Sequence, residues 1–197
     1  MPAATAPMSF AVLLGSVRRQ RMGIRAAKLV IRALQARGHE AILVDPLELQ
    51  LPLLDRMYKE YATGTAPAAL EQLATLYRRV DGFVIVSGEY NHGIPPALKN
   101  LLDHFLEEYF WRPSAIVCYS AGMFGGVRAA VALRTTLAEL GMPGISSECP
   151  IPRIAAALDE DGKPQNEHVE RTLKRFLDEF EWYACAMQRQ RREGTPY

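Results

Sequence analysis

Residues 80–100, VDGFVIVSGEYNHGIPPALKN, join a strand-like run to a helix-like run. The turn between them holds more kinds of polar and aromatic residue than a plain connector needs. The apolar run at 80–86 predicts a buried strand. A glycine, an acid, an aromatic residue and an amide follow it. Pro95 and Pro96 then fit the first turn of a helix whose apolar residues recur at helical spacing. Strand, turn and helix form the repeating unit of an α/β fold, and the turn is a candidate binding segment.

The same alternation runs along the rest of the chain. Its five apolar runs, separated by helical patterns, predict a parallel sheet with helices on both faces. Five strands admit the flavodoxin-like order 2-1-3-4-5, a three-layer sandwich whose ligand crevice lies at the carboxyl ends of the strands. We expect strands at 9–14, 40–45, 80–86, 114–120 and 144–148, and helices at 24–37, 67–79, 127–140 and 166–190 besides the one that includes Leu98 to Phe105.

A chain of 197 residues is long enough for one domain with a full core. We expect that domain over 9–190, after a flexible leader at 1–8 and before a solvated tail at 191–197. The segment 46–65 is long and mixed in composition, which is typical of a binding or interface segment.

Composition argues against several classes of protein. The net charge of +1 gives no general reason to expect a nucleic acid partner. No apolar run is long enough for a membrane span, and the amino terminus lacks the layout of a secretory signal. The three cysteines are far apart and show no metal-ligand spacing, so we expect reduced thiols, no metal and a cytoplasmic location.

Glycine-bearing turns follow the first, third and fourth predicted strands, at 15–23, 88–93 and 122–126. In the expected order these turns meet at one crevice. The first, GSVRRQRMG, lies at the amino end of a helix, where backbone N–H groups, the Ser16 hydroxyl and the arginines favour a phosphate. It matches neither G-x-G-x-x-G nor the P-loop pattern. A plain connecting turn with solvated arginines is the alternative.

The other two turns offer groups for a planar ligand. Tyr90 could pack against a ring, Asn91 could donate and accept at its edge, and Ser120 could donate to a carbonyl. A turn that caps a helix is the alternative. The pattern G-x-S-x-G is absent, so His92 is interpreted as an edge or interface residue and not as a base.

Three motifs together resemble the NAD(P)H-dependent FMN reductases, a flavodoxin-like family that includes quinone, azo-dye and chromate reductases. They are GSVR at 15–18, EYNHGIPPALKNLLD at 89–103, and S-x-G-x-x-G-G at 120–126 before a helix with Leu133 and Arg134. The resemblance covers about residues 9–150, and its most specific part is E-Y-N-x-x-x-P-x-x-L-K-N.

The resemblance implies FMN as the cofactor and NADPH or NADH as the co-substrate. It assigns the phosphate to the first turn, the isoalloxazine to the second, and the other side of the ring to the third. It names no catalytic side chain and no metal. The implied FMN-binding residues are Gly15, Ser16, Arg18, Arg21 and Gly23, then Glu89, Tyr90, Asn91, His92 and Gly93, then Ser120 and Gly122.

One departure from the family stands beside this motif: Gly88 takes the place where the family usually has proline, so the turn is expected to be more mobile and FMN affinity lower. The family also forms homodimers or homotetramers through the helix after E-Y-N, which here carries an apolar face from Leu98 to Phe105.

The expected function is FMN-dependent transfer of hydride from NAD(P)H to a quinone, an azo compound, a metal oxyanion or another small acceptor. A flavodoxin-type electron carrier without nicotinamide oxidation is the first alternative, although such carriers are typically acidic and this chain is near neutral. A flavin-free regulatory domain is the second.

Overall fold

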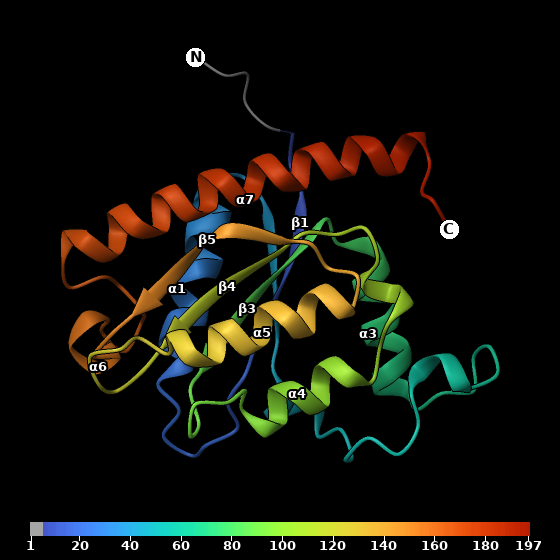
Figure 1. Ribbon diagram of the computed structural model, residues 1–197, viewed down its shortest axis with the longest axis horizontal. Helices are drawn as coiled ribbons and strands as arrows, with labels where there is room; N and C mark the ends of the chain where they lie inside the picture. The colour runs from blue at the N-terminus through green and yellow to red at the C-terminus, as the bar shows by residue number, and fades with distance from the viewer. Residues whose placement is uncertain (1–5) are drawn as a thin grey trace.

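Five parallel strands form one sheet in the computed structural model, which describes residues 6–197 (Figure 1). Their order is β2-β1-β3-β4-β5, and every neighbouring pair is parallel. The predicted flavodoxin-like fold is therefore confirmed. The strands are β1 (Ser9–Leu14), β2 (Glu40–Val44), β3 (Gly82–Gly88), β4 (Ser114–Tyr119) and β5 (Gly144–Ile151).

Helices cover both faces of the sheet (Figure 1). One face carries α1 (Gly23–Ala36) and α7 (Glu167–Glu193), and the other carries α3 (Ala68–Arg79), α4 (Pro96–Asp103) and α5 (Val127–Glu139). Short helical segments are α2 (Pro46–Leu49), α6 (Ile154–Ala157) and the 3-10 turns Tyr58–Glu60 and Glu107–Tyr109. Within residues 6–197, no helix combines the length and the apolar character of a membrane span.

The central strands β1, β3 and β4 are mainly apolar because both of their faces are buried, whereas the edge strands β2 and β5 are partly exposed. In β1, Phe10, Val12 and Leu14 pack toward α1 and α7. Ala11 and Leu13, which alternate with them, pack toward α3, α4 and α5. The two cores thus share one set of strands and lie on opposite sides of the sheet.

The register of the strands brings their carboxyl ends to one edge. Leu14 pairs with Val86, Gly88 pairs with Tyr119, and Tyr119 pairs with Ile151. The turns that follow β1, β3 and β4 therefore start next to one another.

Two strand boundaries differ from the expected ones. β3 begins at Gly82 instead of Val80, because the Val80 amide still closes α3 by donating to the Leu76 carbonyl at 3.1 Å. β5 continues to Ile151, well past the predicted residue 148, because it stays paired with β4 along that length.

The predicted leader and tail are both wrong in part. Met8 is buried in the core, and its amide donates to His39 Nδ1 at 3.2 Å. Residues 1–5 lie outside the described part of the chain. At the other end α7 continues to Glu193, and the Arg191 guanidinium is bound to Asp81, so the start of the predicted tail is anchored to the fold.

The apolar face of α4 cannot serve the subunit contact that the resemblance implied. Leu98, Leu101, Leu102 and Phe105 are all buried within this chain, against α3 and the sheet. Lys99 and Asp103, four residues apart on the same helix, form an ion pair.

Candidate functional site

A pocket of about 180 Å³ lies at the carboxyl edge of the sheet, where β1, β3 and β4 end. The first two glycine-bearing turns contribute to its lining, as do the end of β4, the two residues that lead into the third turn, and the start of α6. The first two turns therefore share one crevice, whereas residues 122–126 of the third turn do not line it. The lining residues are Ser16, Arg18, Gln20, Arg21, Met22, Gly88, Glu89, Tyr90, Tyr119, Ser120, Ala121 and Ile154.

The first turn leads to an uncapped amino end of α1. The Gly15 amide donates to the Val86 carbonyl at 2.8 Å, which ties the turn to β3. No side chain caps α1, and its first turn holds no acid. Its amino-terminal N–H groups and the positive end of its dipole therefore suit an anion. Ser16 is buried at this end of the pocket, and Arg18 is exposed.

Arg21 braces the first turn against β2. Its two terminal nitrogens donate to the two Asp45 oxygens at 2.5 Å each, and Nη1 also donates to the Ser16 carbonyl at 3.1 Å. Asp45 accepts a further bond, at 2.9 Å, from the Leu47 amide at the start of α2. The charge of Arg21 is thus balanced by a carboxylate that no sequence pattern indicated. A contact of Arg21 with the FMN phosphate stays a prediction.

The second turn is a tight reversal between Tyr90 and Gly93. Their backbones exchange two hydrogen bonds, with N···O distances of 3.1 and 2.9 Å. Asn91 and His92, between them, have φ angles of 50° and 66°, and positive φ at both central residues is typical of a type I′ turn. Asn91 and His92 are exposed at its tip and do not line the pocket. Their contact with a flavin ring, and that of Gly93, stays a prediction.

Tyr90 bridges the second turn to the first. Its hydroxyl lies 2.8 Å from the Ser16 hydroxyl, and the Arg18 guanidinium carbon lies 6.0 Å from the centre of its ring. The side chain was expected to pack against a planar ligand. The structure places its hydroxyl beside the Ser16 hydroxyl instead.

Glu89 ties the second turn to the third by capping α5. Its Oε2 accepts from the Arg128 and Ala129 amides at 3.0 and 3.3 Å, and its Oε1 lies 3.6 Å from the Arg128 guanidinium. A carboxylate at this position satisfies free N–H groups and opposes the helix dipole. Glu89 lines the pocket and at the same time anchors a neighbouring helix.

Ser120 organises its own turn. Its hydroxyl donates to the Gly122 carbonyl at 2.9 Å and accepts from the Gly125 amide at 2.9 Å. Gly126 then enters α5 with a φ of 81°, and a Cβ there would lie 2.7 Å from the Tyr119 carbonyl oxygen. Ser120 lines the pocket whereas Gly122 does not, so the binding roles of both stay predictions.

Sequence reasoning missed Tyr119 and Ile154. Tyr119 is the last residue of β4, and Ile154 is the first residue of α6. Tyr119 ended an apolar strand and so looked like a core residue. Burial raises the pKa of Tyr119 to about 12. The available signal was the aromatic, hydroxyl-bearing side chain of Tyr119 at the carboxyl end of a mostly apolar strand.

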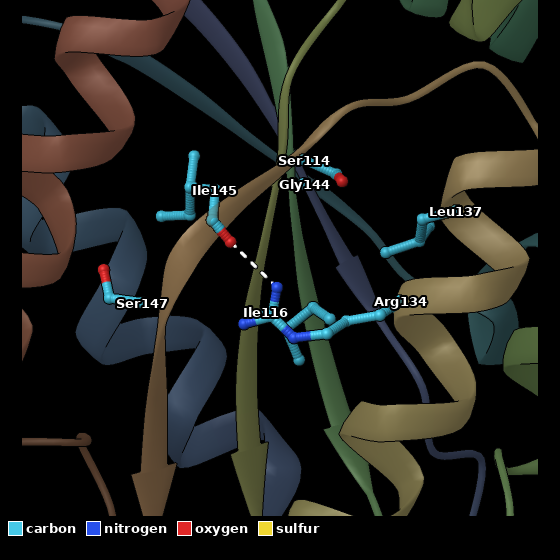
Figure 2. A pocket seen from close by; sticks show the side chains of 7 residues that line it. All are labelled: Ser114, Ile116, Arg134, Leu137, Gly144, Ile145 and Ser147. Carbon is cyan, nitrogen blue, oxygen red and sulfur yellow. Dashed lines mark hydrogen bonds between the residues drawn. The ribbon is translucent and has the colours of Figure 1, made fainter.

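A second hollow, of about 120 Å³, is structural (Figure 2). It lies beside a register shift in which three residues of β5, 145–147, stand opposite one residue of β4. Arg134 from α5 donates to the carbonyls of Ile145 and Ser146 at 3.0 and 2.8 Å, and to Glu148 at 2.6 Å. On the other face, Glu179 of α7 accepts from the Ser146 amide at 2.8 Å and from the Ser147 hydroxyl. These contacts satisfy the bulged backbone.

The pocket at the sheet edge fits FMN in the chemistry of its two ends. At one end lie the uncapped amino terminus of α1, the Ser16 and Tyr90 hydroxyls and the Arg18 guanidinium, which suit a phosphate. At the other end lie Gly88, Glu89, Ser120 and Ala121, whose backbone groups can donate to and accept from the edge of a ring. A Cβ at nearby Gly122 would meet nothing within 4 Å.

Comparison with known sequences gives one family. The sequence model described as NADPH-dependent FMN reductase matches residues 8–156. A quinone reductase of Pseudomonas putida is 32% identical over 180 residues, which cover 87% of this chain and 92% of the relative. An NADPH azoreductase of a Bacillus species is 28% identical over 116 residues, which cover 57% of this chain and 65% of the relative.

Comparison with solved structures gives the same fold. FerB from Paracoccus denitrificans, a flavoenzyme NAD(P)H:(acceptor) oxidoreductase, superposes with a TM-score of 0.73 at 24% sequence identity. The match covers 90% of this chain and 97% of FerB.

Proposed function

Because this chain belongs to the NADPH-dependent FMN reductase family, we propose that it oxidises NADPH or NADH and reduces a small acceptor at the pocket between its three turns. The observation that carries the proposal is the convergence of the uncapped amino end of α1 with Tyr90 and Ser120 at that one pocket. When bound, FMN supplies the chemistry by accepting a hydride and passing electrons on.

The protein's own part is to bind and orient. Ser16, Arg18 and the amino end of α1 hold the phosphate, because hydroxyl, guanidinium and backbone N–H groups all donate there. Glu89 holds the second and third turns at a constant separation through its bonds to α5. That separation sets the room for two stacked rings, whose reacting atoms must come within about 3.5 Å.

A quinone is the acceptor class that we propose first. The Pseudomonas putida relative, which covers most of this chain, is named a quinone reductase. Azo compounds and metal oxyanions are the other acceptors to compare, and NADPH is to be compared with NADH.

Anaerobic reduction tests the proposal directly. The FMN-saturated protein is mixed with NADPH or NADH, and flavin absorbance is followed before and after adding a quinone, an azo dye or chromate. Bleaching by the nucleotide and recovery with the acceptor support the proposal. A flavin-saturated protein that ignores both nucleotides contradicts it.

A flavodoxin-type electron carrier is the second candidate, favoured only by the shared fold. The net charge of +1 argues against it. The same experiment separates the two, because a carrier exchanges electrons with a redox partner while nicotinamide remains unoxidised.

We propose that the protein forms a homodimer or a homotetramer. Its subunit contact is the segment after β2, since the apolar face of α4 is buried within the chain. That segment exposes 84% of Leu53, beside a groove of about 280 Å³ that Pro96 and Ala97 of α4 also line. Apolar surface of this kind is typical of subunit contacts. Light scattering of the wild type and of Leu53→Asp tests it, since the variant is expected to dissociate.

We also propose a reducing compartment, the cytoplasm, as the place of action. All three cysteines are free, and two of them, Cys118 and Cys149, are buried. Free thiols are usual where glutathione keeps them reduced. Fractionation of the source cells, with an antibody to this chain, tests the location.

A further inference from the structure

Tyr119 reaches from the end of β4 to the start of α1. Only 7% of Tyr119 is exposed, and the residue lines the pocket. A Cβ built on Gly23, the first residue of α1, would lie 2.3 Å from the Tyr119 hydroxyl oxygen. The phenol therefore lies against the helix end that suits a phosphate.

Two glycines make room for this side chain. Besides the contact at Gly23, a Cβ at Gly88 would lie 3.2 Å from the Tyr119 ring and hydroxyl. Neither glycine has the positive φ that would require glycine for conformational reasons. Glycine is unfavourable within a helix or a strand, and at these two positions the missing side chain leaves the space that the Tyr119 ring occupies. Gly88, which replaces the family's proline, and Tyr119 thus form a matched pair.

The Tyr119 hydroxyl lies among the polar groups at the end of α1. The Ser16 hydroxyl pairs with Tyr90 at 2.8 Å, and a hydrogen bond with the same Ser16 side chain opposes the rise that burial causes in the pKa of Tyr119. A phenol is protonated near neutral pH, and burial raises the pKa of Tyr119 further, to about 12. Because the hydroxyl lies against the amino end of α1 and Tyr119 lines the pocket, it can donate to an anion bound there.

We propose that Tyr119 is a further cofactor-binding residue, whose hydroxyl donates to the phosphate of FMN and strengthens the preference for FMN over riboflavin. The inference rests on the proposed function, because it takes FMN as the ligand of this pocket. It predicts that removal of the Tyr119 hydroxyl oxygen weakens the binding of FMN and leaves the binding of riboflavin nearly unchanged.

The test compares flavin affinities of the apoprotein. Dissociation constants for FMN and for riboflavin are measured by flavin fluorescence for the wild type and for Tyr119→Phe. We expect FMN binding to weaken about ten-fold or more, the effect of losing a hydrogen bond to a charged group, and riboflavin binding to change less than about two-fold. Tyr109→Phe is the matched control, since its hydroxyl bonds to the Leu102 carbonyl in the core, away from the pocket.

Other outcomes overturn the inference. Equal weakening of both flavins places the hydroxyl away from the phosphate, and no weakening of either removes it from the site. A wild type that binds neither flavin refutes the proposed function itself, whereas a wild type that binds FMN with an unaffected variant refutes only the role of Tyr119. Thermal unfolding of the apoproteins shows whether Tyr119→Phe is folded.

Discussion

Arg18 is an exposed cation of the first turn, and it lines the pocket beside the ring of Tyr90. Arg21, three residues later, is paired with Asp45 instead. The two arginines therefore contribute differently: Arg21 holds the shape of the turn, and Arg18 is the one with its charge available to an anion.

Replacing Arg18 by alanine is expected to weaken FMN binding by about 1.5–3 kcal/mol, because a hydrogen bond to a charged group is lost. Riboflavin binding should change little, since riboflavin has no phosphate. Titration of the apoprotein with each flavin measures both effects. Arg19→Ala is the control, because Arg19 is exposed and does not line the pocket. Equal affinities for FMN in the two variants would remove Arg18 from the phosphate site.

Glu89 acts on stability as well as on the site, because it caps α5 from another turn. Glu89→Ala should lower the free energy of unfolding of the apoprotein by about 1 kcal/mol, the usual effect of losing a helix cap. Urea unfolding measures this. The control is Glu139→Ala at the carboxyl end of the same helix. An acid is unfavourable beside the negative end of the helix dipole, so its loss should not lower the stability of the helix. If both variants unfold alike, the cap contributes nothing.

At the scale of elements, the bulge in β5 is held from both faces of the sheet. Arg134 satisfies its carbonyls from α5, and Glu179 satisfies its amides from α7. Hydrogen bonding, first from the Ser147 hydroxyl and then from the backbone of Ser146 and Ser147, holds the pKa of Glu179 below its usual 4.5. Arg134 belongs to the LR pair that marked the family resemblance, and the bulge gives a structural reason for it.

The lowered pKa makes this contact dependent on pH. Because the folded pKa lies below the unfolded one, the stabilisation is complete above about pH 4.5 and is lost as pH falls through the folded pKa. The stability deficit of Glu179→Gln should therefore be largest at neutral pH and shrink in acid. Urea unfolding from neutral to acidic pH tests this, with exposed Glu193→Gln of the same helix as control. A deficit that is constant with pH would contradict it.

At the scale of the whole molecule, α7 spans the sheet from the β5 side to the amino ends of the strands (Figure 1). Its last turns are anchored by Arg191, which donates to Asp81 at 2.9 Å and to the Trp111 carbonyl at 2.9 Å. Asp81 also accepts from Gln188 and from the Ser9 amide. This cluster joins the carboxyl-terminal helix to β1 and to the start of β3.

Arg191→Ala should lower the free energy of unfolding by about 1.5–3 kcal/mol, since a partly buried carboxylate loses its charged partner. Arg192→Ala is the matched control, because Arg192 is the exposed neighbour. Thermal and urea unfolding of the two variants give the comparison. Equal stability of both would mean that the end of α7 is only loosely held.

Strands, helices and the three glycine-bearing turns could be predicted from the sequence, because each depends on local patterns. Apolar runs mark strands buried on both faces, and apolar residues at helical spacing mark helices. Parallel strands separated by helices then allow few topologies, so the shared crevice at the carboxyl edge followed as well.

Only the tertiary structure decided the partners within that crevice. The pairing of Arg21 with Asp45, the cap that Glu89 provides and the reach of Tyr119 to Gly23 each join residues from different strands and turns. The inward apolar face of α4 and the anchored end of α7 are of the same kind. Periodicity shows that a side chain is apolar or polar, but the neighbour that it meets depends on how distant segments pack in three dimensions.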